Sequence, residues 1–251
     1  MSTISKGVIL AGGQGTRLRP ATQVINKHLI PIMNVPMICY PLATLKRMGV
    51  IEVFIVSGGE NIGGFTEFLG SGSQFGMDIT YGVQDEALGI ANALSRAESF
   101  VSKTEMFAVI LGDNVFEGTP PSPQGSEYYS GRCSLYTSQV EDNRRFGVPV
   151  WEDGKLIKIV EKPQENISDG KAIVGLYVYP TSVFEVISDL SVSDRGEYEI
   201  TDVNNYYVKH DLCDVHDFKG FWTDAGTPES LVAATEFASS QEINPYDYLK
   251  S

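Results

Sequence analysis

The stretch KGVILAGGQGTRLRPATQVINKHLIPI, residues 6–32, decides the fold of this 251-residue chain. It begins with a short, continuous apolar run that ends in glycine, and such a run is typical of a strand buried on both faces of a sheet. Three glycines and three cations follow in the same stretch: Gly12, Gly13, Gly15, Arg17, Arg19 and Lys27. The stretch therefore predicts a strand that leads into a loop of bare backbone with positive charge beside it.

Strands and helices alternate through the first half of the chain. Further buried strands are predicted from the apolar runs at residues 52–59, 79–84 and 106–111. Helical spacing is present at residues 36–50 and 89–101. Pro36 and Gly49 punctuate the first of these helices, and Pro41 is expected to kink it. This alternation predicts a parallel, doubly wound α/β sheet.

The second half has a different pattern. Residues 117–131 are rich in Pro, Gly and Ser and predict a surface loop. Residues 147–163 predict a β-hairpin that turns at residues 152–154. Further strands are predicted at 132–140, 172–180 and 213–218, and further helices at 181–190, 199–211 and 227–240, with Thr181 as a cap and Pro228 in the first turn of the last. No linker divides the chain, so residues 1–251 are predicted to form a single domain with mixed sheet in its second half.

Composition excludes several classes of function. The net charge of −13 repels phosphate backbones, so nucleic acid is not an expected partner. No apolar run approaches the ~20 residues needed to cross a bilayer. The N-terminal residues carry no apolar signal core, which predicts a cytoplasmic protein. The three cysteines lack metal-ligand spacing and are interpreted as reduced core thiols.

Three interpretations compete for the glycine loop at residues 10–20. It is a glycine-rich turn without function, a dinucleotide-binding fingerprint, or a nest of backbone N–H groups around an anion. The fingerprint fails because Leu18 stands where its third glycine belongs, and Pro20 comes too early for the long helix that should follow. A nest needs glycines that adopt positive φ, and Arg17 would add a planar fork of donors. The pattern favours a phosphate-binding loop.

The loop and several later motifs resemble the sugar-1-phosphate nucleotidyltransferases, and within them most closely the glucose-1-phosphate thymidylyltransferases. The motifs, in the order that the family has them, are LAGGQGTRLRPAT, NKHLIPI, LGDN, RRFGV, VEKP, VGLYVYP, GEYEITDVNNYY and WTDAGT. The resemblance runs from about Lys6 to Ala238. It implies a Rossmann-like, doubly wound mixed sheet with a smaller sugar-binding β portion. The nucleotide-binding part would be about residues 1–114, and the sugar-binding and metal-completing part about residues 132–240.

The resemblance also implies a reaction and the residues that serve it. A sugar-1-phosphate oxygen attacks the α-phosphorus of dTTP, pyrophosphate leaves, and the product is dTDP-glucose. Arg17 and Lys27 would be the catalytic cations, whereas Arg19 is interpreted as a surface residue. The nucleotide-binding residues would be Leu10, Ala11, Gly12, Gly13, Gly15, Thr16, Gln84 and Gly89. The residues for the sugar phosphate would be Gly147, Glu161, Lys162, Ile173 and Tyr177.

Asp113 and Asp224 are the candidate ligands of Mg²⁺. Each could equally be a turn or helix cap, but Asp113 ends an apolar strand, where open α/β sheets bind ligands. Mg²⁺ commonly takes one or two carboxylates together with phosphate oxygens. In a phosphate-handling protein of strongly negative charge, the two aspartates together predict a magnesium site, and the resemblance implies the same.

Several other residues carry alternatives. Gln84 could read a base edge with its carboxamide or be an ordinary strand-end residue. Near it, Ala87 and Asn92 depart from the proline-containing GLAQA pattern of the family. Glu161 and Lys162 could be a solvated ion pair, because neighbours on a strand face opposite ways and reach one ligand only where the strand bends. In the sugar pocket, Phe146 replaces the Tyr of many relatives and Ile173 replaces a smaller Val.

Within the enzyme class, the alternative is a uridylyltransferase or a transferase for another hexose 1-phosphate. Outside it, the alternative is a non-catalytic sensor of sugar nucleotides, which the presence of both candidate cations and both aspartates disfavours. The resemblance implies a homo-oligomer such as a tetramer. The chain resembles the short type of the family, so feedback through the regulatory nucleotide site of longer relatives is not expected.

Overall fold

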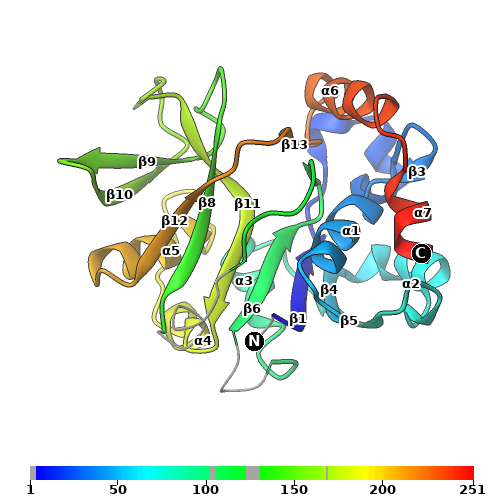
Figure 1. Ribbon diagram of the computed structural model, residues 1–251. Helices are drawn as coiled ribbons and strands as arrows, with labels where there is room; N and C mark the ends of the chain where they lie inside the picture. Colours follow the sequence, from blue (N-terminus) through cyan, green and yellow to red (C-terminus); the bar gives the residue numbers. More distant parts are fainter. Residues whose placement is uncertain (1–3, 102–105, 123–130, 168) are drawn as a thin grey trace.

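A mixed, seven-stranded sheet forms the centre of the computed structural model, which describes residues 4–101, 106–122, 131–167 and 169–251. The strand order is β12-β8-β11-β6-β1-β4-β5 (Figure 1). These strands are β1 (Lys6–Leu10), β4 (Glu52–Gly58), β5 (Asp78–Gln84), β6 (Met106–Leu111), β8 (Cys133–Gln139), β11 (Lys171–Pro180) and β12 (Cys213–Asp217). The α/β class and the mixed sheet predicted from the sequence are confirmed.

The parallel half of the sheet contains a topological switch point. Strand β1 pairs in parallel with β4 on one side and with β6 on the other. The chain therefore winds outward from β1 through β4 to β5, and then crosses back to β6. Loops that follow β1 and β6 diverge at such a point and leave a crevice at the carboxyl ends of the strands, where open α/β sheets bind ligands.

Helices cover both faces of the sheet. Along β1, Ile9 faces one core cluster, whereas Val8 and Leu10 face the other, as the two-residue period of a strand requires. The first cluster is covered by α1 (Cys39–Arg47), α2 (Ile62–Leu69), α6 (Pro228–Ser239) and α7 (Pro245–Lys250). The second is covered by α3 (Ile90–Ser95), α4 (Val183–Ser188) and α5 (Ile200–Lys209). The two sets lie on opposite sides of the sheet in Figure 1.

Short elements complete the fold. The 3-10 turns are η1 (Thr16–Leu18), η2 (Ala21–Gln23), η3 (Lys27–Leu29), η4 (Gly59–Asn61) and η5 (Ser73–Phe75). Three small ladders lie outside the main sheet: β2 (Pro31–Ile32) with β3 (Val35–Pro36), β7 (Asn114–Phe116) with β13 (Trp222–Asp224), and β9 (Gly147–Glu152) with β10 (Lys155–Glu161). No helix in the described part of the chain is long and apolar enough to cross a membrane.

The predicted hairpin is present as β9 and β10. Its turn falls at Asp153 and Gly154, which have φ angles of 49° and 77°. Positive φ at both central residues suits the right-handed twist of the flanking strands. The hairpin projects from the body of the molecule (Figure 1) and is tied to it by Asn205 of α5, which accepts a bond from Ile159 N at 2.7 Å and donates to Ile159 O at 2.9 Å.

Some element boundaries differ from the sequence predictions. Helix α1 begins at Cys39, so Pro41 lies in its first turn, where a missing N–H costs nothing, and Pro36 belongs to β3. The helix expected over residues 89–101 is shorter, as α3, and the cap residue of α4 is Ser182 rather than Thr181. Helix α2 was not predicted. Residues 123–130 of the predicted surface loop lie outside the described residues.

Candidate functional site

One cavity of about 540 Å³ opens at the switch point and extends toward the hairpin. Most residues singled out in the sequence line it: Leu10, Gly12, Gly13, Arg17, Lys27, Gln84, Gly89, Asp113, Gly147, Glu161, Lys162, Ile173, Tyr177 and Asp224. Ala11, Gly15 and Thr16 do not line the cavity. Side chains from both halves of the chain therefore meet in one place, although they are spread over more than 200 positions of the sequence.

The glycine loop differs in detail from the expected nest. Of Gly12, Gly13 and Gly15, only Gly15 has a positive φ, 61°. The other two are needed because side chains approach them closely. A Cβ atom on Gly12 would lie 2.7 Å from Gln84 Oε1, and one on Gly13 would lie 3.2 Å from Lys27 Cε. Bare backbone here makes room for Gln84 and Lys27.

The three loop residues outside the cavity lining are Gly15, Thr16 and Ala11. The Gly15 carbonyl accepts a bond from Thr22 Oγ1 at 2.7 Å, and Gly15 precedes η1, which begins at Thr16. Ala11 is fully buried, and its carbonyl accepts a bond from Ser57 Oγ at 3.3 Å. Gly15 and Ala11 are therefore bonded to neighbouring segments, although neither lines the cavity.

Two short strands bring the candidate metal ligands together. β13 pairs antiparallel with β7, so that Asp224 lies opposite Asn114, and Ala225 N donates to Asp113 O at 2.8 Å. The position that a Cβ of Gly226 would take lies 3.1 Å from Asp224 Oδ2, 3.4 Å from Asp113 Oδ2 and 3.5 Å from Arg17 Nη2. Both carboxylates and the Arg17 guanidinium thus converge on one small space that only glycine leaves open.

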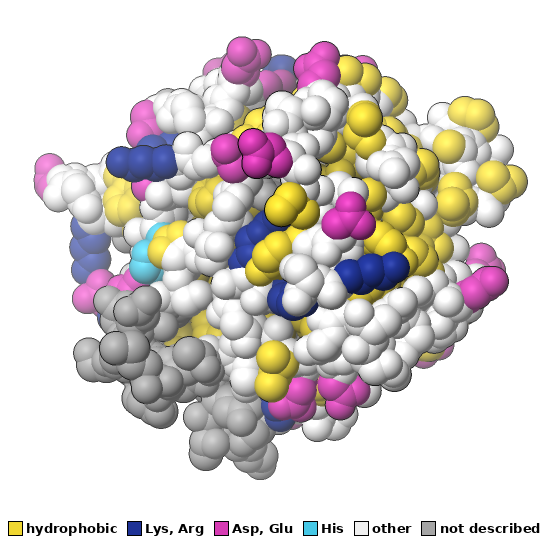
Figure 2. Space-filling view, turned by 45° about the vertical axis from the view of Figure 1, so that its right-hand side comes forward, with side chains coloured by type: hydrophobic (Ala, Val, Ile, Leu, Met, Phe, Trp, Pro, Cys, Tyr) yellow, Lys and Arg dark blue, Asp and Glu magenta, His cyan; other side chains and the backbone are white. Residues whose placement is uncertain are grey.

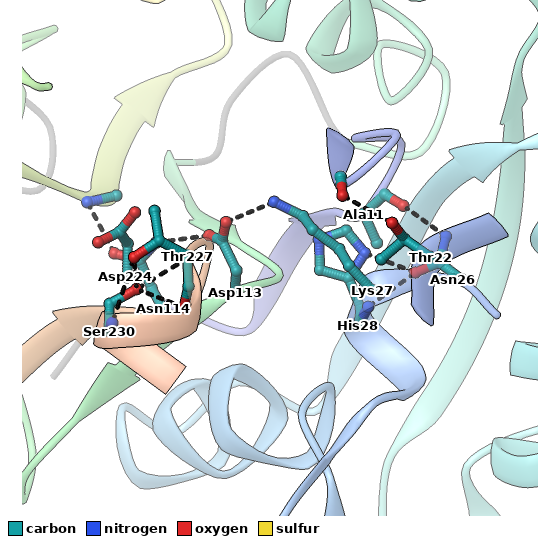
Figure 3. Close-up of polar contacts among 12 residues, drawn as sticks. Ala11, Thr22, Asn26, Lys27, His28, Asp113, Asn114, Asp224, Thr227 and Ser230 are labelled. Carbon is teal, nitrogen blue, oxygen red and sulfur yellow. Dashed lines mark hydrogen bonds and ion pairs between the residues drawn. The ribbon is translucent and has the colours of Figure 1, made fainter. Parts of the chain in front are cut away.

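Each of the two aspartates contacts a cation. Lys27, from η3, reaches across the crevice, and its Nζ lies 2.5 Å from Asp113 Oδ2 (Figure 3). Arg145 Nη2 lies 2.5 Å from Asp224 Oδ2. Asn114 donates to Asp113 Oδ1 at 2.9 Å and is itself fixed by Trp222 Nε1, which donates to its Oδ1 at 2.7 Å. These contacts hold the carboxylates with their oxygens toward the shared space.

The two carboxylates nevertheless differ in pKa. Burial opposes ionisation of Asp113, but the adjacent Lys27 ammonium and the bonds that Asp113 accepts hold its pKa well below the usual range. Burial, and then the negative charge of Asp113, raise the pKa of Asp224 to about 6, although Arg145 opposes this. Burial and the charge of Lys27 lower the pKa of His28 to about 3, so the imidazole in this cavity is neutral.

The donor set fits a hard divalent cation. In the described part of the chain no group of three or more His, Cys, Asp and Glu side chains could hold a metal. Two carboxylates that face one space are the usual protein contribution to a Mg²⁺ site, in which phosphate and water oxygens supply the other ligands. Burial and the charge of Asp113 raise the pKa of Asp224, and a cation bound between the two carboxylates would oppose both effects.

The hairpin side of the cavity carries Glu161 and Lys162. Strand β10 ends at Glu161, and Lys162 has a φ of 41°, so the backbone turns and both side chains line the cavity. Glu161 Oε2 accepts a bond from Thr201 Oγ1 at 2.5 Å, and Glu161 Oε1 lies 3.4 Å from Lys162 Nζ. The bend required for a shared ligand is therefore present, together with the ion pair of the alternative interpretation.

Sequence reasoning missed several residues of the cavity. Arg145 was part of a quoted motif but received no role, and its Nε is buried with no hydrogen-bond partner among the described residues. Asn114 and Thr201 lie beside residues that were singled out, and His28 has no ligand or nucleophile spacing in the sequence, yet all three line the cavity. The signal for Arg145 and Asn114 was their position next to Phe146 and Asp113, inside the motifs RRFGV and LGDN.

Basic residues are concentrated in this site, where four basic and four acidic residues line the cavity. Figure 2 shows acidic side chains scattered over one face of the molecule, with basic side chains partly recessed near its middle. The chain carries 19 basic residues against 32 acidic ones. Four of the basic side chains, Arg17, Lys27, Arg145 and Lys162, line the single cavity described above. A local concentration of cations in an acidic protein indicates a site for an anion.

Three comparisons with known proteins agree on one family. Residues 6–241 match the family model described as nucleotidyl transferase. A glucose-1-phosphate thymidylyltransferase of Neisseria meningitidis is 38% identical over 241 residues, which cover 94% of this chain and 83% of the relative. A crystal structure from Bacillus anthracis, assigned as a glucose-1-phosphate thymidylyltransferase and bound to sucrose, has a TM-score of 0.86 and 41% identity, covering 96% of this chain and 97% of that one. UDP-glucose pyrophosphorylase bound to UDP-glucose has a TM-score of 0.78 and 25% identity, covering 94% and 98%.

Proposed function

Because the chain belongs to the nucleotidyl transferase family, we propose that it transfers the thymidylyl group of dTTP to glucose 1-phosphate. The products are dTDP-glucose and pyrophosphate. The relatives support nucleotidyl transfer to a sugar 1-phosphate as the class of reaction. The choice of dTTP and of glucose rests on the names of the most similar relatives and on the residues discussed next.

The observation that carries the proposal is a series of neighbouring groups along the cavity. It leads from Gln84 through the glycine loop to Lys27 and Asp113, and then past Gly226 to Asp224. Arg145 pairs with Asp224. Beyond Arg145, Lys162 N donates to Phe146 O at 3.0 Å, and the side chains of Lys162 and Glu161 follow. Groups suited to a base, a triphosphate, a sugar phosphate and sugar hydroxyls thus occur in the linear order of a nucleoside diphosphate sugar.

The chemistry asks little of the protein beyond alignment and charge. An oxygen of the sugar phosphate forms a bond to the α-phosphorus of dTTP, and the bond from that phosphorus to the bridging oxygen of pyrophosphate breaks. Arg17 and Lys27 lie beside the glycine loop, where they stabilise the charge that moves onto pyrophosphate. Lys162 holds the phosphate of the acceptor, and Glu161 accepts hydrogen bonds from its sugar hydroxyls.

Asp113 and Asp224 would hold Mg²⁺, which supplies Lewis-acid compensation for the phosphate charge when bound. The protein's own residues prepare the site. Asn114 fixes one oxygen of Asp113, and Gly226 leaves the space between the two carboxylates open. Arg145 and Lys27 compensate the carboxylates of the ligand-free protein.

A matrix of triphosphates against sugar 1-phosphates tests the proposal, with pyrophosphate release as the readout. We expect dTTP with glucose 1-phosphate to give the highest kcat/KM, and turnover to require a divalent cation. A maximum with UTP or with another hexose 1-phosphate would keep the family and change the substrate. If sugar nucleotides bind but no pair of substrates releases pyrophosphate, the protein is a sensor and the proposed function is wrong. A cytoplasmic location, a homo-oligomeric state and the absence of a nucleic-acid partner stay predictions.

A further inference from the structure

Gln84 lies at the end of the cavity opposite the hairpin and is held in one orientation. The residue is only 7% exposed at the end of β5. Gln84 Nε2 donates to the Gly89 carbonyl at 3.3 Å and to Asn92 Oδ1 at 3.0 Å. Gln84 Oε1 points toward the bare backbone of Gly12. All donors and acceptors of this amide can therefore be assigned.

The Gly89 carbonyl determines which atom of the Gln84 amide is the nitrogen and which is the oxygen. A backbone carbonyl only accepts, so the Gln84 atom that faces it must be the nitrogen. The Gly89 carbonyl is held in place because it also accepts a bond from Ala93 N at 3.1 Å. The residues on either side of Gly89 are bonded to Tyr198, whose N donates to Leu88 O at 2.8 Å and whose carbonyl accepts from Ala91 N at 3.1 Å.

Asn92 then takes the second hydrogen of the amide. It lies on α3, and its Oδ1 faces Gln84 Nε2. An amide nitrogen has two hydrogens, and with Gly89 and Asn92 as acceptors both are used. Only Gln84 Oε1 remains to meet a ligand. Asn92 itself does not line the cavity, so it acts through Gln84.

We propose that Asn92 is a positioning residue that makes Gln84 present an acceptor, and no donor, to the base of the nucleotide. This inference rests on the proposed function and deepens it. A base that offers an N–H at the facing position is accepted, as thymine and uracil do with N3–H. Cytosine has no hydrogen on N3. Its N3 lone pair would face the lone pairs of Gln84 Oε1, so two acceptors would oppose each other without a hydrogen between them.

To accept cytosine, Gln84 would have to turn its amide over. Its oxygen would then face the Gly89 carbonyl, and also Asn92 Oδ1 unless the Asn92 amide turned as well. Each buried polar atom that loses its partner in this way is destabilising. The two acceptors around Gln84 therefore disfavour cytosine without contacting it.

Two substitutions of Asn92 separate this role from a general one in packing. Asn92→Leu removes the acceptor, so Gln84 can turn more easily, and we expect the ratio of kcat/KM for dTTP to that for dCTP to fall about tenfold. Asn92→Asp keeps an acceptor and cannot turn into a donor, so the ratio should stay at or above that of the wild type. The ratio for dTTP to dUTP is an internal control, because these bases share the N3–H edge, and it should not change in either variant.

The result that overturns the inference is a dTTP to dCTP ratio in Asn92→Leu within twofold of the wild type. An equal loss of the ratio in Asn92→Asp would overturn it too, and this variant decides the matter if Asn92→Leu does not fold. Titration calorimetry with the same nucleotides gives the ratio of dissociation constants independently of turnover. If the wild type binds dTTP and dCTP but releases no pyrophosphate, the proposed function fails while the binding ratio still tests Asn92.

Discussion

Asp113 and Asp224 line one cavity, each against a cation, yet the two regions that supply them differ. Asp113 belongs to the nucleotide half and pairs with Lys27, and both side chains are largely buried, at 11% and 13% exposure. Asp224 belongs to the half that carries the hairpin and pairs with Arg145, which is 34% exposed. The pKa of Asp113 is lowered and that of Asp224 is raised. The Lys27–Asp113 pair is thus buried and compensated, whereas the Arg145–Asp224 pair is more exposed and leaves a carboxylate whose ionisation a bound cation would favour.

The largest expected effects come from the carboxylates themselves. Asp113→Asn and Asp224→Asn should each lower turnover on the order of 10²-fold or more, because either change weakens the predicted metal site. The variants should differ in stability. Asp113→Asn leaves the Lys27 ammonium buried without its partner and should cost about 1–3 kcal/mol. Asp224→Asn should change stability by less than about 0.5 kcal/mol, since Arg145 can reach water.

Pyrophosphate release and chemical denaturation measure the two quantities separately. Near-normal turnover of both variants at limiting Mg²⁺ would show that the metal assignment is wrong. Equal losses of stability would show that the two carboxylates are equivalent and that the contrast between the regions is not real.

Arg17, whose guanidinium lies beside the space between the two carboxylates, tests whether a cation here acts in the transition state. Arg17→Lys keeps the charge and loses the planar fork, so we expect dTTP to bind within a few-fold of the wild type and kcat to fall on the order of 10²-fold. Arg19→Lys is the matched control on an exposed neighbour and should stay within about 0.5 kcal/mol of the wild type. Calorimetry gives binding and pyrophosphate release gives turnover. Equal, mild effects at both positions would remove the catalytic role of Arg17.

Lys162 tests whether the basic side chain that follows the hairpin binds the sugar phosphate and not the triphosphate. Lys162→Ala should raise the KM for the sugar phosphate about tenfold to a hundredfold, from the loss of about 1.5–3 kcal/mol of charged hydrogen bonding, with little change in the KM for dTTP. Lys158→Ala, on the exposed side of the same hairpin, is the control. An unchanged KM for the sugar phosphate would mean that Lys162 only forms a solvated ion pair with Glu161.

The smallest expected effect concerns Arg145. If its bond to Asp224 competes with a metal ion, Arg145→Gln should tighten the binding of Mn²⁺ to the nucleotide-free protein about two- to fivefold, as expected for a partly exposed ion pair. Electron paramagnetic resonance of free Mn²⁺ measures this without turnover. Arg144→Gln is the control, because Arg144 pairs with Asp142 at 2.7 Å on the surface. Weaker Mn²⁺ binding in Arg145→Gln would mean that Arg145 supports the metal site.

The sequence was sufficient where neighbours in the chain are neighbours in space. The continuous apolar run of β1, the hairpin turn at Asp153 and Gly154, and the place of Pro228 in the first turn of α6 were local and therefore predictable. The expected kink at Pro41 was wrong because the start of a helix depends on what precedes it, and here the short strand β3 takes the residues that were expected to open the helix.

Contacts between distant segments could not be predicted from pattern alone. The pair of Arg145 with Asp224 joins residues 79 positions apart, and the ladder of β7 with β13 that sets it up has only three pairs. Such a short ladder has no periodic signal. The close approach of Gln84 to Gly12 explains why glycine is required there, yet from the sequence the same glycine suggested a positive φ.

The separateness of the β9–β10 hairpin has a consequence for how this protein can diverge. Within the described residues the hairpin forms a sheet of its own, tied by Asn205, and it shares no ladder with the seven-stranded sheet. Substitutions on it need no compensating change in the strands that carry the glycine loop. During evolution, single substitutions in the hairpin can therefore change which sugar 1-phosphate is bound, while the glycine loop and its cations stay unchanged.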